Sequence, residues 1–304
     1  MTKQVFSGPG HLSVSQIHAI QENPWHWFLE RVARVPQVPS WAQVAGTAYH
    51  SLTEFLDHRI ITDDDWTTDR DEISALWEEY LAVAVAEQQK RTDAPVSEWK
   101  ATGRASRQWP NKEDREFWEK SGPSWVLNYL TWRMNNPSWE VADINGAPAI
   151  EAEIGGTFRG ASLPLIGYID RVFYNPTTKE HMVVDIKSGT RTPADTLQLG
   201  TYSLMLDLMY GIRPRWGAFW MARTGSTSVP ADLHRDWPHE RLEHEILTAE
   251  KIIRGEALSC NVGGFAASSS AAQFCYACTG IQEDTLLPWE VSLKIPDFST
   301  SHQA

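Results

Sequence analysis

The sequence predicts an α/β protein in which a central mixed β-sheet is flanked by helices and preceded by a helical N-terminal region. Apolar residues recur at helical spacing through much of residues 1–140, whereas strand-like segments dominate residues 149–187. A strongly helical segment then leads to a further strand-like segment at residues 216–222. A helix between two strands of one sheet is typical of folds with helices on both faces of the sheet.

Helices are expected at residues 12–35, 41–59, 69–90, 194–210 and 236–254, and around residues 125–132. Ser13 or Ser15 can cap the first helix, while Pro24 lies inside its pattern and predicts a break. Thr192-Pro193 is expected to open the fourth helix, and Gly211 to close it in the left-handed conformation.

Strands are expected at residues 149–158, 163–174, 181–187 and 216–222. No repeat or long low-complexity tract divides the chain. We therefore expect a single domain, residues 1–304, that consists of a helical part (1–140), a sheet core (145–255) and a cysteine-containing C-terminal segment (256–304).

The composition limits the function classes. The 304 residues carry 27 basic and 39 acidic side chains and a net charge of −12, which argues against a protein whose whole surface coats nucleic acid. A local basic cleft that binds a few phosphates remains compatible with this charge. Three cysteines exclude a disulfide scaffold and fit a reducing compartment. No segment has the pattern of a signal peptide or a membrane span, so we expect a cytoplasmic protein without a membrane contact.

The most informative stretch is Gly167-Tyr168-Ile169-Asp170, followed by Asp185-Ile186-Lys187. Side chains at i and i+2 of a strand point to one face, so Asp185 and Lys187 project together. If Asp170 lies on a neighbouring antiparallel strand, two carboxylates and an ammonium group meet at one end of the sheet. Carboxylates suit Mg²⁺, and a lysine beside them can orient a water and stabilise charge on a phosphate. An isolated Asp-x-Lys is, however, more often a surface ion pair.

Three further residues accompany this pair. Gln198 and Tyr202 are i, i+4 neighbours on one helix face, and His50 lies on an otherwise apolar helix. A lone histidine of this kind, such as His50, is more often a hydrogen-bonded core residue than a metal ligand. Glu153, on the strand before Asp170, can either reach the same site or face solvent.

In this order, five motifs resemble the RecB-like exonuclease branch of the PD-(D/E)XK nuclease superfamily, which includes CRISPR-associated RecB-like nucleases and phage exonucleases. The motifs are Leu-Ser-Val-Ser-Gln (12–16), Gly-Thr-Ala-Tyr-His (46–50), Ile-Gly-Tyr-Ile-Asp-Arg-Val (166–172), Val-Val-Asp-Ile-Lys-Ser-Gly (183–189) and Gln-Leu-Gly-Thr-Tyr-Ser (198–203). The resemblance extends from Leu12 to Cys278.

The resemblance implies a restriction-endonuclease-like core that hydrolyses DNA at ends or in single strands and leaves 5′-phosphates, in repair, recombination or phage DNA metabolism. It assigns the metal ligands as His50, Asp170, Asp185 and the backbone carbonyl of Ile186. The imidazole favours Mn²⁺ as well as Mg²⁺. Lys187 is then the catalytic lysine, and Gln198 and Tyr202 flank the site and contact the substrate.

Two other functions are compatible with the same fold. One is a non-catalytic subunit that binds DNA ends or a protein partner, which the presence of Asp170, Asp185 and Lys187 argues against. The other is a nuclease of CRISPR spacer acquisition, which would need adaptation proteins as partners. Recombination proteins are the partners expected of a repair nuclease.

Many relatives of this branch hold an iron–sulfur cluster with four cysteines. In this sequence Asn23 stands where the first cysteine is expected, and the C-terminal segment holds Cys260, Cys275 and Cys278. Three thiolates cannot complete the usual ligand set. The cysteines therefore represent a structural remnant, a zinc site completed by a histidine, or an unusual cluster.

A polar stretch combines aromatic and basic residues: Trp99, Lys100, Arg104, Arg107, Trp109 and Lys112. Cations with interspersed aromatic rings are typical of a path for single-stranded nucleic acid, and also occur in a solvated loop. By contrast, Trp125, Tyr129 and Trp132 have the helical spacing of a core stripe.

Overall fold

The computed structural model describes residues 8–22, 27–32, 34, 37–62 and 69–254. These described residues divide into two compact units, one drawn from the ranges 1–37, 155–167 and 238–304 and the other from 38–154 and 168–237. The second unit contains most of the helical part of the chain and most of the sheet. That the whole chain acts as one nuclease domain stays a prediction.

Among the described residues, eight strands form one mixed sheet with the order β1-β6-β7-β8-β10, in which β2 and β5 also pair with β6, and β9 with β8. The strands are β1 (Leu12–Ser13), β2 (Glu140–Val141), β5 (Ile150–Thr157), β6 (Pro164–Asn175), β7 (Glu180–Lys187), β8 (Trp216–Met221), β9 (Ser226–Thr227) and β10 (Ala231–Asp232). β6 and β7 are antiparallel, whereas β7 and β8 are parallel. A separate hairpin joins β3 (Asp143–Ile144) to β4 (Ala147–Pro148). The predicted α/β fold class is confirmed.

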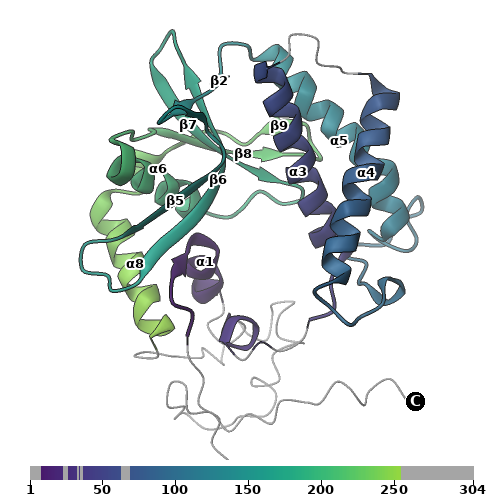
Figure 1. Ribbon diagram of the computed structural model, residues 1–304, viewed down its shortest axis with the longest axis horizontal. Helices are drawn as coiled ribbons and strands as arrows, with labels where there is room; N and C mark the ends of the chain where they lie inside the picture. Colours follow the sequence, from purple (N-terminus) through teal and green to yellow (C-terminus); the bar gives the residue numbers. More distant parts are fainter. Residues whose placement is uncertain (1–7, 23–26, 33, 35–36, 63–68, 255–304) are drawn as a thin grey trace, which may run out of the picture. The chain divides into compact units, whose positions relative to one another are not determined.

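Helices cover both faces of the sheet in the second unit. On one face lie α3 (Trp41–Thr62), α4 (Arg70–Gln89) and α5 (Arg115–Asn135), which pack against one another, and on the other lies α6 (Leu197–Tyr210) (Figure 1). Val184 and Ile186 of β7 enter the core beneath α3–α5, so the alternate residues Asp185 and Lys187 face the opposite side, as the strand period predicts. None of the helices in the described part of the chain is long and apolar enough to span a membrane.

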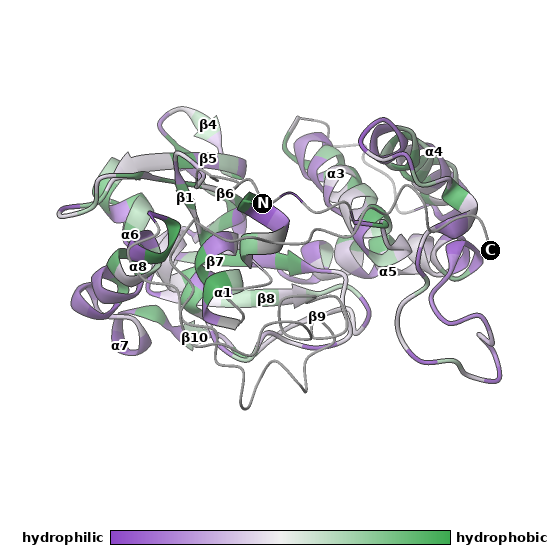
Figure 2. Ribbon diagram, turned by 90° about the horizontal axis from the view of Figure 1, so that it is seen from below, coloured by the Kyte–Doolittle hydropathy of each residue, from purple (hydrophilic) through white to green (hydrophobic). Residues whose placement is uncertain are grey.

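The first unit contains α1 (Val14–Glu22), a π-helix (Phe28–Val32) and α8 (His239–Ile253). α1 packs against α8, whose hydrophilic and hydrophobic stretches are visible in Figure 2. Glu250 of α8 accepts hydrogen bonds from the amides of Ser162 and Leu163, at 2.7 and 2.9 Å, and so fixes the turn between β5 and β6.

Three element boundaries differ from the predictions. The segment 12–35 is not one helix, because Leu12–Ser13 pairs with β6 and α1 begins only at Val14, with the Ser13 hydroxyl accepting from the amide of Gln16. α6 begins at Leu197 rather than at residue 194, since the side chain of Asp195 holds the amide of Leu197. The last predicted helix begins at His239 (α8) rather than at residue 236, because Pro238 has no amide hydrogen and cannot lie inside a helix, and a separate short helix, α7 (Leu233–Asp236), precedes it.

The core of the second unit is rich in tryptophan. Trp77, Trp118 and Trp220 are fully buried in it, and the half-buried Trp125 and Trp132 pack against it. α4 and α5 approach each other so closely that a Cβ on Gly122 would lie 2.0 Å from the ring of Trp77. The absence of a side chain at that glycine is therefore a packing requirement.

A buried ionic cluster joins the helices to the sheet. Asp57 of α3 accepts hydrogen bonds from Nε of Arg171 on β6 at 2.6 Å, from Nε of Arg133 on α5 at 3.0 Å and from the hydroxyl of Tyr129 at 2.5 Å. The side chains of Asp57 and Arg171 have no exposed surface. Because removal of one partner leaves the others charged and buried, the cluster constrains all three elements.

This cluster yields a stability prediction. Asp57→Ala should lower the free energy of unfolding by about 3–5 kcal/mol, since two buried guanidinium groups lose their counter-ion. Glu72→Ala is the control, because it removes an exposed ion pair with Arg59 and should cost less than about 1 kcal/mol. Urea unfolding followed by circular dichroism measures both, and equal effects would contradict the role assigned to Asp57.

Candidate metal centre and active site

The antiparallel pairing of β6 and β7 places the two aspartates next to each other. The register pairs Arg171 with Val184, which sets Asp170 across from Asp185 one step further along. Oδ2 of Asp170 accepts a hydrogen bond from the amide of Ile186 at 2.5 Å. Both carboxylates are nearly buried, with 10% and 3% of their side chains exposed. The strands thus hold two carboxylates at one place with little freedom.

His50 reaches the same place from helix α3. Its Nδ1 lies 3.5 Å from Oδ1 of Asp170 and 3.8 Å from Oε1 of Glu151. About a third of the histidine side chain is exposed. The ring is therefore a member of a polar cluster at the edge of the core and is open to solvent on one side.

Glu151 is the acidic residue of this cluster that the sequence reasoning missed. Ligand atoms of His50, Glu151 and Asp170 lie within 4.8 Å of one another, whereas Glu153 is exposed and lies outside the group. Glu151 has a φ of +45°, a left-handed conformation that is strained for a residue with a side chain. In a regular strand, glutamates at i and i+2 would share a face, so the position of β5 along the sheet and the left-handed backbone at Glu151 distinguish the two, and the sequence encodes neither directly.

Lys187 lies on the other side of the aspartates. Its Nζ is 2.6 Å from Oδ2 of Asp185 and donates to Oε1 of Gln198 at 3.1 Å. Gln198 in turn donates through Nε2 to the hydroxyl oxygen of Tyr202 at 3.0 Å. Burial raises the pKa of Tyr202, so its hydroxyl stays protonated. The residues named by the Gln-x-x-x-Tyr pattern therefore form a chain of hydrogen bonds that ends on the lysine.

The charges of the cluster depend on one another. Burial and the charge of Asp170 raise the pKa of Asp185 to about 7, against the opposing effect of Lys187. Burial alone would lower the pKa of His50, but the Asp170 carboxylate outweighs it and raises that pKa to about 10. Burial would likewise raise the pKa of Asp170, yet the histidine and the amide of Ile186 lower it. The carboxylates thus attract positive charge, which a proton on His50 supplies in part.

The donor set fits a hard divalent cation. Imidazole nitrogen and carboxylate oxygens suit Mg²⁺ and Mn²⁺, and an ion would compete with the proton on His50 for the same electrons. Oε1 of Glu151 is buried and accepts no hydrogen bond from the part of the chain that the structure describes, so an acceptor remains for such an ion. The carbonyl of Ile186 stays a predicted ligand, since the contact described for this residue is through its amide.

The predicted cysteine site cannot be compared with the structure. Cys260, Cys275 and Cys278, and Asn23 near the N-terminus, lie outside the described residues.

The structure distinguishes the two tryptophans of the basic and aromatic stretch. Trp99 is not exposed for stacking on a base, because it is 5% exposed and packs against Trp41 in the core. Trp109, in contrast, is only partly buried.

Comparison with known proteins agrees with this geometry. Residues 11–279 match the PD-(D/E)XK nuclease superfamily, a span that includes every residue of the candidate site. The chain is also similar to the Gene 69 protein of Mycobacterium phage D29, with 28% identity over 79% of this chain and 86% of the relative. With two aspartates and a lysine on adjacent strands of a mixed sheet, and a family match across most of its length, the chain belongs to the PD-(D/E)XK nuclease superfamily.

Proposed function

We propose that the protein is a metal-dependent DNA exonuclease of the RecB-like branch, which hydrolyses phosphodiester bonds at DNA ends or in single strands. The observation that carries the proposal is the convergence of His50, Asp170 and Asp185 with Lys187. Membership of the nuclease superfamily implies DNA as the substrate. The RecB-like branch is favoured because helix α3 contributes a histidine, His50, that lies beside Asp170.

The residues of the cluster divide the work of hydrolysis. His50, Asp170, Asp185 and Glu151 would hold the divalent ion. When bound, such an ion supplies an activated water and neutralises negative charge on the phosphate. The water oxygen forms a bond to phosphorus as the bond to the 3′-oxygen breaks, and the leaving oxygen takes up a proton, which leaves a 5′-phosphate.

Lys187 acts on the substrate side of the site. Its ammonium group forms an ion pair with Asp185, and the hydrogen bond to Gln198 restricts where it lies. A cation fixed beside the carboxylates can donate to the attacking water or to a phosphate oxygen and stabilise charge that grows in the transition state. Tyr202 fixes the amide of Gln198 and so acts on the lysine indirectly.

The biological setting proposed is phage DNA metabolism, repair or recombination. The similarity to a protein of a mycobacterial phage supports the first of these. A non-catalytic subunit would have no need for a lysine paired with a buried aspartate, so we favour an active enzyme over a binding subunit.

The exonuclease proposal predicts which DNA is degraded. End-labelled linear single- or double-stranded DNA should be degraded with Mg²⁺ or Mn²⁺ and remain intact with a chelator. Covalently closed circular single strands should be resistant, because they have no end. Gel electrophoresis of both substrates in one reaction measures this. Rapid cleavage of the circles would indicate an endonuclease instead.

The roles of the aspartate and the lysine can be separated. Asp185→Asn should weaken Mn²⁺ binding and reduce cleavage by more than about a hundredfold, since the loss of a group that merely orients a ligand already costs 10–100-fold. Lys187→Met should reduce kcat by roughly 10²–10³-fold, as loss of a transition-state donor does, with metal affinity largely kept. Isothermal titration with Mn²⁺ and single-turnover cleavage give the two quantities. Full activity in either variant would refute the assignment.

Glu151 offers a matched test against Glu153. Glu151→Gln keeps the size of the side chain but removes its charge, and should weaken Mn²⁺ binding by about tenfold. Glu153→Gln makes the same change two residues away on an exposed side chain and should leave the affinity unaltered. If the two variants bind Mn²⁺ equally well, Glu151 is not part of the metal site.

A further inference from the structure

Residues 103–112 form a loop whose two flanking residues, Thr102 and Glu113, are bridged to each other. Thr102 and Glu113 pair as an isolated antiparallel bridge, with the amide of Glu113 donating to the carbonyl of Thr102 at 3.0 Å. The Thr102 hydroxyl also donates to the Glu113 carboxylate, at 3.2 Å. The two ends of the loop are therefore fixed, although the loop itself is largely exposed.

Arg223 connects the base of this loop to the end of strand β7, which carries Lys187. Arg223 donates through both terminal nitrogens to the carboxylate of Glu113, at 2.8 and 3.0 Å. Its Nε donates to the carbonyl of Ser188 at 2.8 Å, and Ser188 directly follows Lys187. A single side chain, that of Arg223, therefore links the base of the loop to the end of β7, beside the candidate active site.

The loop presents cations that the rest of the described chain does not neutralise. The side chains of Arg104, Arg107 and Lys112 are exposed and form no hydrogen bond or ion pair with another described residue. In a protein with a net charge of −12, exposed cations close to the catalytic strand provide a local attraction for phosphates.

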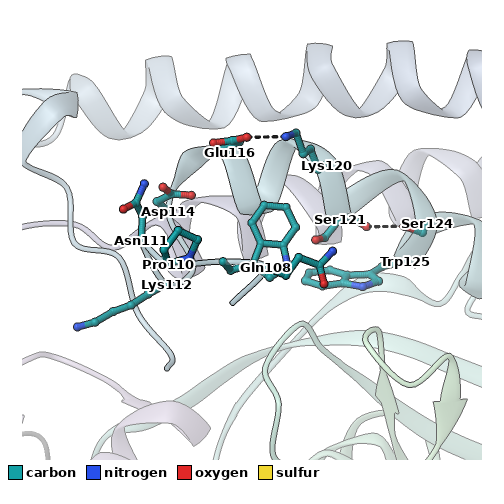
Figure 3. Close-up of a pocket in the computed structure, with 11 residues that line it drawn as sticks. Gln108, Pro110, Asn111, Lys112, Asp114, Glu116, Lys120, Ser121, Ser124 and Trp125 are labelled. Carbon is teal, nitrogen blue, oxygen red and sulfur yellow. Dashed lines mark hydrogen bonds and ion pairs between the residues drawn. The ribbon is translucent and has the colours of Figure 1, made fainter. Parts of the chain in front are cut away.

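A cavity of about 600 Å³ opens between the loop and the first turns of α5 (Figure 3). Its volume is within the range of small-molecule sites and can accommodate a nucleoside. The neutral side chains that line it include aromatic rings, amides and hydroxyls: Gln108, Trp109, Asn111, Ser121, Ser124 and Trp125. Aromatic faces stack on bases, while amides and hydroxyls hydrogen-bond to base edges.

The charged residues of the cavity favour a base over a phosphate. Glu116 pairs with Lys120, and Asp114 accepts from the amide of Phe117 as the cap of α5. Both acidic groups are therefore engaged, and together with Lys112 and Lys120 they leave the lining without a net positive charge that would attract a phosphate. Lys112 remains at its lining as a cation for the backbone of a strand.

Both aromatic rings of the cavity lining contact neighbouring side chains. Trp109 packs edge-on against Phe117, with ring centroids 5.1 Å apart, which fixes its plane. The guanidinium of Arg223 lies 4.9 Å from the ring of Trp125. Arg223 therefore contacts the cavity lining, the base of the loop and the residue that follows Lys187.

We propose that the loop 103–112 and this cavity form a binding site for single-stranded DNA next to the scissile phosphate. One unpaired base enters the cavity against Trp109 and Trp125, while Arg104, Arg107 and Lys112 contact the phosphates of the adjoining nucleotides. The inference rests on the proposed nuclease function. A base can enter such a cavity only when it is unpaired, so the site selects single strands or frayed ends over intact duplex.

The test measures binding of a fluorescent oligothymidylate by anisotropy in chelator, where cleavage does not interfere. Replacing both Arg104 and Arg107 by alanine should flatten the slope of log affinity against log salt by about 1 to 1.4, since each phosphate contact on a single strand contributes about 0.7. The control is the double variant Arg70→Ala with Arg91→Ala. It removes two exposed cations, one at the start of helix α4 and one just after its end, and should leave the slope unchanged.

The tryptophan is tested separately from the charges. Trp109→Ala should weaken binding by roughly fivefold to 150-fold, as loss of one stacked base does, with the salt slope kept. Trp109→Phe should restore most of the affinity, because a ring is again present. Blunt duplex of the same length should lose much less affinity from Trp109→Ala than the single strand does.

Unaltered single-strand affinity and slope in the arginine variant, or equal losses on duplex and single strand in Trp109→Ala, would overturn the proposal. Hydrolysis of a thymidine 5′-phosphate nitrophenyl ester by the wild-type protein with Mn²⁺ tests the metal site alone. If the ester is not hydrolysed, the proposed nuclease function is contradicted. The binding measurements in chelator test the proposed loop site independently of that result.

Discussion

The candidate site depends on a carboxylate that takes no part in its chemistry. Asp57 lies two turns after His50 on α3, and its partner Arg171 directly follows Asp170 on β6. One buried ion pair therefore sets how the helix that carries the imidazole lies against the strand that carries the aspartate. Arg171 also contacts the site itself, because its Nη1 is 3.5 Å from the carboxylate of Glu151. Burial of such a cluster is costly and gives little net stability, but it defines one arrangement of three elements.

The parts of the site that follow from a strand period were predictable from the sequence. Alternation alone requires Asp185 and Lys187 to share a face while Val184 and Ile186 enter the core, and that is their arrangement. The i, i+4 spacing of Gln198 and Tyr202 likewise leads to the hydrogen bond between them. In both cases the relevant distance is fixed within one element of secondary structure.

Other parts depend on contacts between elements and could not be derived in this way. The choice of Glu151 over Glu153 depends on the position of β5 along β6 and on a strained backbone that no local preference favours. Trp99 looked like a stacking residue because its neighbours are polar, yet the ring is buried against Trp41, which is 58 positions earlier in the chain. The predicted start of the last helix at residue 236 was wrong for a local reason, because proline cannot continue a helix and α8 begins only after Pro238.

The left-handed backbone at Glu151 has a consequence for how the chain can change over time. Strain of this kind costs about 1–3 kcal/mol, and glycine would remove it without a steric penalty. The same exchange would delete a carboxylate from the group that faces His50 and Asp170. Selection for thermal endurance and selection for activity therefore act in opposite directions on one codon, as is common where a protein maintains a strained active site. A lineage freed from the need to cut DNA would be expected to lose this glutamate early, while Asp57 would persist, because its loss leaves two buried arginines without a counter-ion.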